Sequence, residues 1–274
     1  MNGPTSTPEG GQPPIATASA DAPSGRAPAP AEARQRWRLT FAREPVTSDQ
    51  VGQAALESWQ RALAASGLPI AGLEPGGPGR ARIVFAAPLS AAAGGDAELA
   101  DLWFLERRPL WAVREALADR LPAAHRWGSA EDIWLGAPAL PGRVVAADWR
   151  IEIAMTAVDD GRLASAARRL LDARSLPRVR HKGATEKRYD LRPMIDGISL
   201  GPASAGESSG ARSDAPPNMI ARVRTRFHPE LGAGRPEDVI AALGEAAGRP
   251  VEIVGLTRRR LILADGSESG RPAG

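Results

Sequence analysis

Two successive blocks of the chain carry the same order of periodic segments, and this repetition constrains the fold more than any other feature. In the first block, Trp37, Leu39 and Phe41 alternate with polar residues, which predicts a half-buried strand. A helix is expected from about Ser48, a suitable N-cap, to Gly67, a suitable stop. The block continues with strands at 80–89 and 98–107, a helix that Pro109 opens, and a strand at 130–135.

The second block repeats this order. It comprises a strand at 145–157, a helix capped by Asp159 or Asp160, a basic strand at Arg178 with its return through 187–191, a strand at Met219, a helix opened by Pro236, and final strands near 251–254 and 259–264. Strand, helix, strand, strand, helix, strand is the order of the ferredoxin-like sandwich. We therefore expect an α+β protein of two ferredoxin-like (βαββαβ) halves with antiparallel sheets. In this topology the strands at Arg178 and Arg222 are neighbours.

Composition divides the chain into ordered and disordered parts. Residues 1–34 are rich in Pro, Gly, Ala, Ser and Thr, which predicts a disordered tail. The first half is expected at 35–142 and the second at 143–265, with a flexible insertion at 201–217. Residues 266–274 are expected to form a second disordered tail.

Several classes of function are disfavoured by what the sequence lacks. There is no cysteine, which excludes disulfides, thiolate zinc sites and a cysteine-ligated iron–sulfur cluster within these residues. His125, His181 and His228 do not have metal-ligand spacing, and the glycine-rich stretch 72–80 is typical of a turn. No serine-hydrolase, zinc-protease or nucleotide-binding motif is present. No apolar run is long enough to cross a bilayer. We expect a cytoplasmic protein without membrane association, metal or cofactor.

Positive charge is concentrated in the C-terminal part of the chain. Residues 174–274 contain 17 Lys and Arg against 12 Asp and Glu, whereas the first 173 residues contain 18 against 20. The stretch 176–195 holds both lysines of the protein, Lys182 and Lys187, and its single tyrosine, Tyr189. This asymmetry is an indication of nucleic-acid or anion binding and not of a fold.

Two strands of this region are expected to carry cations on one face. Arg178, Arg180 and Lys182 alternate with other residues in the first, and Arg222, Arg224 and Arg226 alternate in the second. Like charges on neighbouring strands repel, and a bound polyanion would relieve the repulsion. The same pattern also fits the solvated face of an antiparallel sheet.

Asp190 is surrounded in sequence by Lys187, Arg188, Tyr189 and Arg192. Nearby cations depress a carboxyl pKa, so Asp190 is expected to be an ionised acceptor. It is a candidate nucleophile or base for RNA modification, although a brace that orients the neighbouring cations is the favoured role.

Several of these segments together resemble a known family. The chain is similar, over about Trp37 to Ala264, to the radical-SAM-associated domain family of unknown function, number 2344. The similarity is carried by RARIVFAAPL, AELADLWF, DLRPMI, HPELGAGRPEDVIAALG and LTRRRLIL. It implies an accessory module linked to RNA metabolism or modification, fused to or encoded beside a radical-SAM enzyme. Family members usually carry a Gly-Phe-Asn-Pro-His-Pro loop, and this chain has GLEPGGPG there instead.

The sequence therefore predicts a partner-dependent module that binds RNA without catalysis of its own. The expected phosphate contacts are Arg178, Arg180, Lys182, Lys187, Arg192, Arg222, Arg224 and Arg226, with Tyr189 as a stacking surface. One alternative is a protein-interaction scaffold for a radical-SAM partner, docking through Trp103, Trp111, Trp127 and Trp134. The other is an RNA-modifying enzyme that uses Asp190.

Overall fold

The computed structural model describes residues 32–154, 161–182, 185–202 and 219–270. The side chains of 181, 182 and 185 are not described. The expected tail therefore lies outside the described residues except for 32–34, as does most of the insertion expected at 201–217. None of the described helices has the length and apolar character needed for a membrane crossing.

The first half follows the expected order of elements. These are β1 (Gln35–Arg43), a 3-10 turn (Ser48–Gln50), α1 (Gln53–Ala65), β2 (Ile83–Phe85), β3 (Gly94–Phe104), α2 (Leu110–Leu117) and β4 (His125–Ile133). The α-helix begins later than expected, after Gly52. The φ of Gly52 is 63°, which is not a helical conformation, so it separates the 3-10 turn from α1. The strands lie in the order β2-β3-β1-β4, and every neighbouring pair is antiparallel. A core around Leu39, Trp59 and Leu102 fills the space between these strands and the helices.

The second half contains more elements. They are a short 3-10 turn (Leu140–Arg143), β5 (Val144–Ala154), α3 (Arg162–Asp172), β6 (Pro177–Lys182), β7 (Thr185–Asp190), a 3-10 turn (Arg192–Met194), β8 (Ile195–Pro202), β9 (Met219–His228), β10 (Gly232–Ala233), α4 (Pro236–Ala247) and β11 (Glu252–Leu263). Its main strands lie in the antiparallel order β8-β9-β5-β11. In both halves the second strand is thus an edge strand, followed by the third, the first and the fourth.

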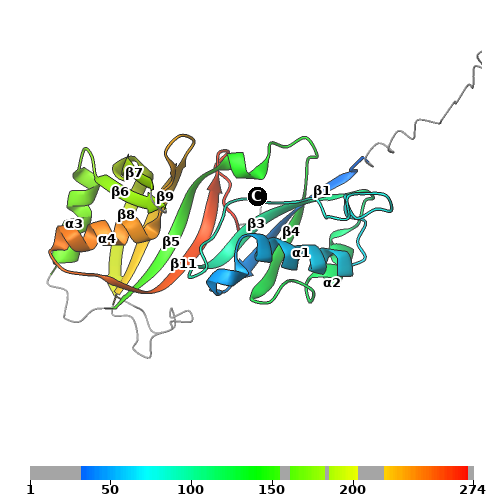
Figure 1. Ribbon diagram of the computed structural model, residues 1–274, viewed down its shortest axis with the longest axis horizontal. Coiled ribbons are helices and arrows are strands. Elements are labelled where there is room, and N and C mark those ends of the chain that lie inside the picture. The colour runs from blue at the N-terminus through cyan, green and yellow to red at the C-terminus, as the bar shows by residue number, and fades with distance from the viewer. Residues whose placement is uncertain (1–31, 155–160, 183–184, 203–218, 271–274) are drawn as a thin grey trace, which may run out of the picture.

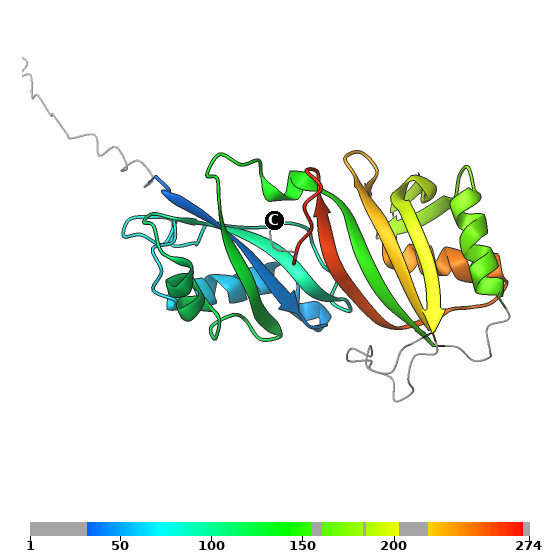
Figure 2. The same ribbon diagram turned by 180° about the vertical axis from the view of Figure 1, so that it is seen from behind.

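The two halves share one sheet of nine strands. β11 pairs in parallel with β3 through Thr257↔Gly94 and Arg258↔Gly95. Helices α1, α3 and α4 lie in front of this sheet in Figure 1 and behind it in Figure 2. The face of β5, β8 and β9 seen in Figure 2 is therefore not covered by these helices.

The expected pairing of the strands at Arg178 and Arg222 is wrong. β6 and β7 pair with each other in a separate two-stranded sheet, and β8 is the neighbour of β9, with Ser199 opposite Arg222. β8 was missed because Gly197, Gly201 and Pro202 weaken a strand pattern. An edge strand with a bulge tolerates such residues, since proline needs no ladder partner there.

The expected C-terminal tail is also partly wrong. Residues 266–270 fold back onto β11, where the Ser269 N–H donates to the Leu261 carbonyl (2.9 Å) and the Leu261 N–H donates to the Ser269 hydroxyl (2.7 Å). Ser269 is buried as a result. Residues 271–274 lie outside the described part of the chain.

Candidate nucleic-acid interface

The alternation in β9 places Arg222, Arg224 and Arg226 on the sheet face opposite its buried residues Ala221 and Val223, as expected. The same face receives side chains from β5, because Arg222 is paired in register with Arg150 and Arg224 with Asp148. Acidic and basic side chains are therefore interleaved across this face.

Carboxylates within the protein relieve much of the repulsion that the sequence suggested. Arg224 binds Asp148 in a bidentate pair (2.6 and 2.9 Å), and Arg260 of β11 donates to the same carboxylate (2.7 Å). Burial would raise the pKa of Asp148, but the hydrogen bonds from the two guanidinium groups outweigh it and hold the pKa below its usual value. We call Asp148, Arg222, Arg224, Arg226 and Arg260 the β9 lattice.

Two further carboxylates border the β9 lattice. Arg226 pairs with Asp196 of β8 (2.5 Å), and Arg260 pairs with Glu268 (2.6 Å). Arg150 and Glu152 of β5 share this face as a buried ion pair, so among the described residues five arginines face four carboxylates, an excess of one positive charge. This surface is close to neutral.

The hairpin β6–β7 carries the other expected cations and is attached to α4. Arg180 donates to Asp238 of α4 (2.7 Å), and the Tyr189 hydroxyl donates to the same carboxylate oxygen (2.7 Å). Burial and the Asp238 carboxylate raise the pKa of Tyr189. The Arg180 guanidinium lies 4.7 Å from the centre of the Tyr189 ring, so one face of the expected stacking surface is already covered.

Two more of the expected phosphate contacts have partners within the protein. Arg178 pairs with Glu245 of α4 (3.0 Å). Arg192 donates to the main-chain carbonyl of Leu171 at the end of α3 (2.7 Å) and to that of Ile195 (2.8 Å). Arg192 therefore ties the end of a helix to the start of β8, which is a structural use of its donors.

Asp190 accepts hydrogen bonds from the main chain at the base of the hairpin. Its Oδ1 atom accepts from the Leu176 N–H (2.7 Å) and the Arg192 N–H (2.9 Å). Burial would raise the pKa of Asp190, but these bonds outweigh it and lower the pKa. The carboxylate thus closes the base of the hairpin mainly through main-chain N–H groups.

A second set of cations is exposed on α3, on the loop that follows it and on the hairpin. Within the described residues, Arg168, Arg174 and Lys187 form no ion pair, and Arg188 pairs with Glu186 where both side chains are largely in solvent. We call these four residues the hairpin cations. Lys182 belongs to β6, and its side chain lies outside the described part.

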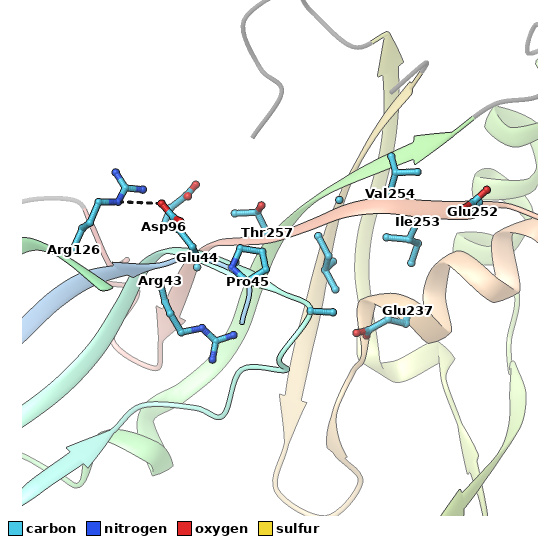
Figure 3. A pocket seen from close by; sticks show the side chains of 15 residues that line it. Arg43, Glu44, Pro45, Asp96, Arg126, Glu237, Glu252, Ile253, Val254 and Thr257 are labelled. Carbon is cyan, nitrogen blue, oxygen red and sulfur yellow. Dashed lines mark ion pairs between the residues drawn. The ribbon is translucent and has the colours of Figure 1, made fainter. Parts of the chain in front are cut away.

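A pocket of about 850 Å³ lined by both polar and apolar groups lies at the seam between the halves, beside the contact of β3 and β11. Figure 3 shows Glu44 and Asp96 on one side of the end of β1, while the Arg43 side chain points away from them. Arg126 lies 3.8 Å from Glu44, and both are exposed. Among the described residues no group of three or more His, Asp or Glu side chains is placed to hold a metal ion.

The tryptophans of the first half are divided between core and surface. Trp103 is buried between the guanidinium groups of Arg36 (4.6 Å) and Arg82 (4.2 Å), and Trp127 is half-buried against the core. Trp111 and Trp134 are 68% and 77% exposed. The latter two are therefore the tryptophans that a partner could contact.

The alternating sequence pattern did not predict the buried charges of the sheet. Arg36 and Arg38 of β1 both pair with Asp101 of β3, at 2.6 and 2.9 Å, where an alternating strand pattern predicts solvent. Arg258 of β11 and Glu98 of β3 form another buried pair (2.5 Å). No local pattern signals such pairs, since their partners are distant in sequence.

Comparison with known protein families identifies one family that the chain matches. Residues 53–221 match a family model described as "Uncharacterized protein conserved in bacteria (DUF2344)". No protein with curated annotation matches the chain.

One similar solved structure is described as "Crystal Structure of a Cbf5-Nop10-Gar1 Complex". It has 9% identity and a TM-score of 0.44, over 82% of this chain and 48% of that chain. The chain thus spans about half the length of that relative. A resemblance this distant does not carry a function from one chain to the other.

Proposed function

Because this chain belongs to the bacterial family DUF2344 through residues 53–221, we propose that it is an accessory module that binds RNA in the cytoplasm beside a radical-SAM protein, without catalysis of its own. The radical-SAM partner is implied by the sequence resemblance described above. These 274 residues contain no cysteine, so the ligands of the partner's iron–sulfur cluster would lie elsewhere.

We further propose that each half is one ferredoxin-like unit, with a boundary near 142. What supports this is the equivalent strand order in the two halves, β2-β3-β1-β4 and β8-β9-β5-β11. The hairpin β6–β7 is then an insertion between the first helix and second strand of the second unit. An insertion at this position can carry function without disturbing the sheet.

The observation that carries the RNA proposal is the difference between the two cation sets. Arg224, Arg226 and Arg260 of the β9 lattice are held by carboxylates. Of the hairpin cations, Arg168, Arg174 and Lys187 have no ion pair among the described residues. A phosphate that displaces an internal carboxylate exchanges one anion for another, whereas a phosphate at an unpaired cation releases counterions. The hairpin cations are therefore the proposed primary phosphate contacts, and the β9 arginines are secondary.

The module is proposed to bind RNA without reading its sequence. Phosphate contacts by Lys and Arg carry no sequence information. Base stacking would need an open aromatic face near these cations, and Arg180 covers one face of Tyr189.

The test is the salt dependence of binding to a single-stranded RNA. The triple variant Arg168→Gln, Arg174→Gln and Lys187→Gln should flatten the log–log slope by about two, since each single-strand contact contributes about −0.7. A matched control changes three exposed arginines of the first half, Arg61, Arg114 and Arg120, to Gln and should leave the slope unchanged. An unchanged slope in the first variant, or equal effects of both, would exclude the hairpin cations as the RNA contacts.

A protein-interaction scaffold is the second candidate, favoured by the exposure of Trp111 and Trp134 and of their neighbours Leu110 and Leu135. Purification of the tagged protein from its own cells distinguishes the two. A radical-SAM protein that is retained after ribonuclease treatment supports direct docking, and its loss from Trp111→Ser and Trp134→Ser variants would place the contact. Loss on ribonuclease treatment supports a link through RNA.

A further inference from the structure

An aromatic cavity of about 480 Å³ lies between α1 and the strands of the first half. Its walls include Phe41, Trp59, Phe85 and His125. The Trp59 ring meets Phe41 at 5.0 Å, Phe85 at 5.5 Å and His125 at 5.4 Å between centroids, the last two edge to face. These rings pack against one another and form a rigid wall. The volume and apolar lining of the cavity are in the range of small-molecule binding sites.

The cavity exists because only the C-terminal part of the apolar side of α1 is packed into the core. The apolar stripe of this helix runs through Ala55, Trp59 and Leu63, and the last two are buried; Val51 precedes the helix. Val51 and Ala55, together with Leu56, are only half-buried and line the cavity. The N-terminal part of the stripe therefore faces open space and not packed side chains.

One end of the cavity is polar and carries an excess of positive charge. Glu98 lines it, but Arg258 neutralises this carboxylate with two hydrogen bonds (2.9 and 2.5 Å). The remaining cation is Arg43, which donates to the main-chain carbonyls of Leu89, Ser90 and Ala93 and to no carboxylate in the described part of the chain. Burial is the main cause that lowers the pKa of His125, so its ring is neutral at physiological pH.

The donors of Arg43 are not fully used by the protein. Its Nε–H is buried without a hydrogen-bond partner in the described residues. Figure 3 shows that the side chain points away from Glu44, the next residue in the sequence, and from Asp96 of β3. Glu98 attracts Arg43, but this carboxylate is already paired with Arg258. A guanidinium group with spare donors at the end of an apolar cavity matches a carboxylate better than a neutral group, because such bonds are charge-assisted.

We propose that this cavity binds a small aromatic monocarboxylate, with its ring against the half-buried side chains of Phe85 and His125 and its carboxylate on Arg43. A ligand with several phosphates is disfavoured, because a single uncompensated cation faces a largely apolar space. The site lies in the first half and does not involve the hairpin cations, so it is independent of the RNA proposal.

Three probes of similar size test the chemistry in titration calorimetry. They are 2-naphthoate, its neutral counterpart 2-naphthylmethanol, and the aliphatic anion decanoate. We expect 2-naphthoate to bind most tightly and to shift the indole N–H resonance of Trp59. Arg43→Gln should weaken 2-naphthoate by about tenfold or more and leave 2-naphthylmethanol unchanged. Arg126→Gln is the control, since this exposed arginine follows His125 in sequence but does not line the cavity.

A second pair of variants tests the location. Ala55→Trp fills the cavity and should abolish binding, whereas Ala64→Trp places the same ring on the exposed side of α1 and should not. Ala55→Leu, a smaller filler, should weaken binding if Ala55→Trp does not fold. Absence of 2-naphthoate binding at millimolar concentration, unchanged binding in the Ala55 variants, or tighter binding of decanoate would each overturn the proposal.

Discussion

Arg258 of β11 and Glu98 of β3 form a buried, bidentate ion pair that joins the two halves of the protein. The same guanidinium donates to the main-chain carbonyls of Pro88 (3.0 Å) and Ala87 (3.2 Å), which form part of the wall of the aromatic cavity. The pair lies beside the short parallel contact between β3 and β11, so one arginine holds both the seam and the loop next to it.

Arg258→Met should therefore destabilise the protein by about 3–5 kcal/mol, because it leaves the Glu98 carboxylate buried without its partner. Urea unfolding measures this loss. Arg259→Met is the matched control, since Arg259 pairs with Asp96 at the surface and such pairs contribute about 1 kcal/mol or less. Equal effects of the two substitutions would contradict a special role for the buried pair.

The substitution Asp190→Asn tests whether the Asp190 carboxylate has a structural or a catalytic role. Asparagine keeps an oxygen that can accept from the Leu176 and Arg192 N–H groups, so RNA binding should be nearly unchanged. A catalytic base would lose about 10²- to 10⁴-fold in rate. Any turnover by the purified protein that this substitution abolishes would refute the non-catalytic assignment.

The stability that Asp148 contributes should depend on pH in a defined direction. The carboxyl pKa is lower in the folded protein than the value of about 3.9 expected for the unfolded chain. Its contribution is therefore fully present above that value and is lost as the pH falls through the lower, folded-state pKa. Asp148→Asn should lower the urea midpoint of unfolding at neutral pH. The difference in midpoint from wild type should shrink in strong acid. Asp172→Asn, an exposed change at the end of α3, should show no comparable difference.

Arg224→Gln tests whether the β9 lattice acts mainly in structure or in binding. The substitution breaks a bidentate pair with Asp148, so we expect a lower unfolding midpoint than for Arg168→Gln. In RNA titrations we expect the opposite order, with Arg168→Gln changing the salt slope more. A larger slope change for Arg224→Gln would move the primary interface to the sheet face.

The periodic segments were predictable because their causes are local. The period of two at Trp37, Leu39 and Phe41 made β1, and the alternation in MIARVRTRF placed the three β9 arginines on one face. Pro236 at the first turn of α4 and Gly248 at its end, with a φ of 72°, follow the usual asymmetry of helix termini. These features depend on residues within a few positions of one another.

The sequence by itself thus determined the order of elements in the first half, the helices of both halves, and which cations share one face of β9. Only the tertiary structure decided that β8 and not β6 lies beside β9, that Arg224 meets Asp148 from 76 positions away, and that Arg36 and Arg38 are buried on Asp101. Pairing between strands and the burial of charge depend on contacts between distant parts of the chain, and local periodicity carries no information about which partner will be there.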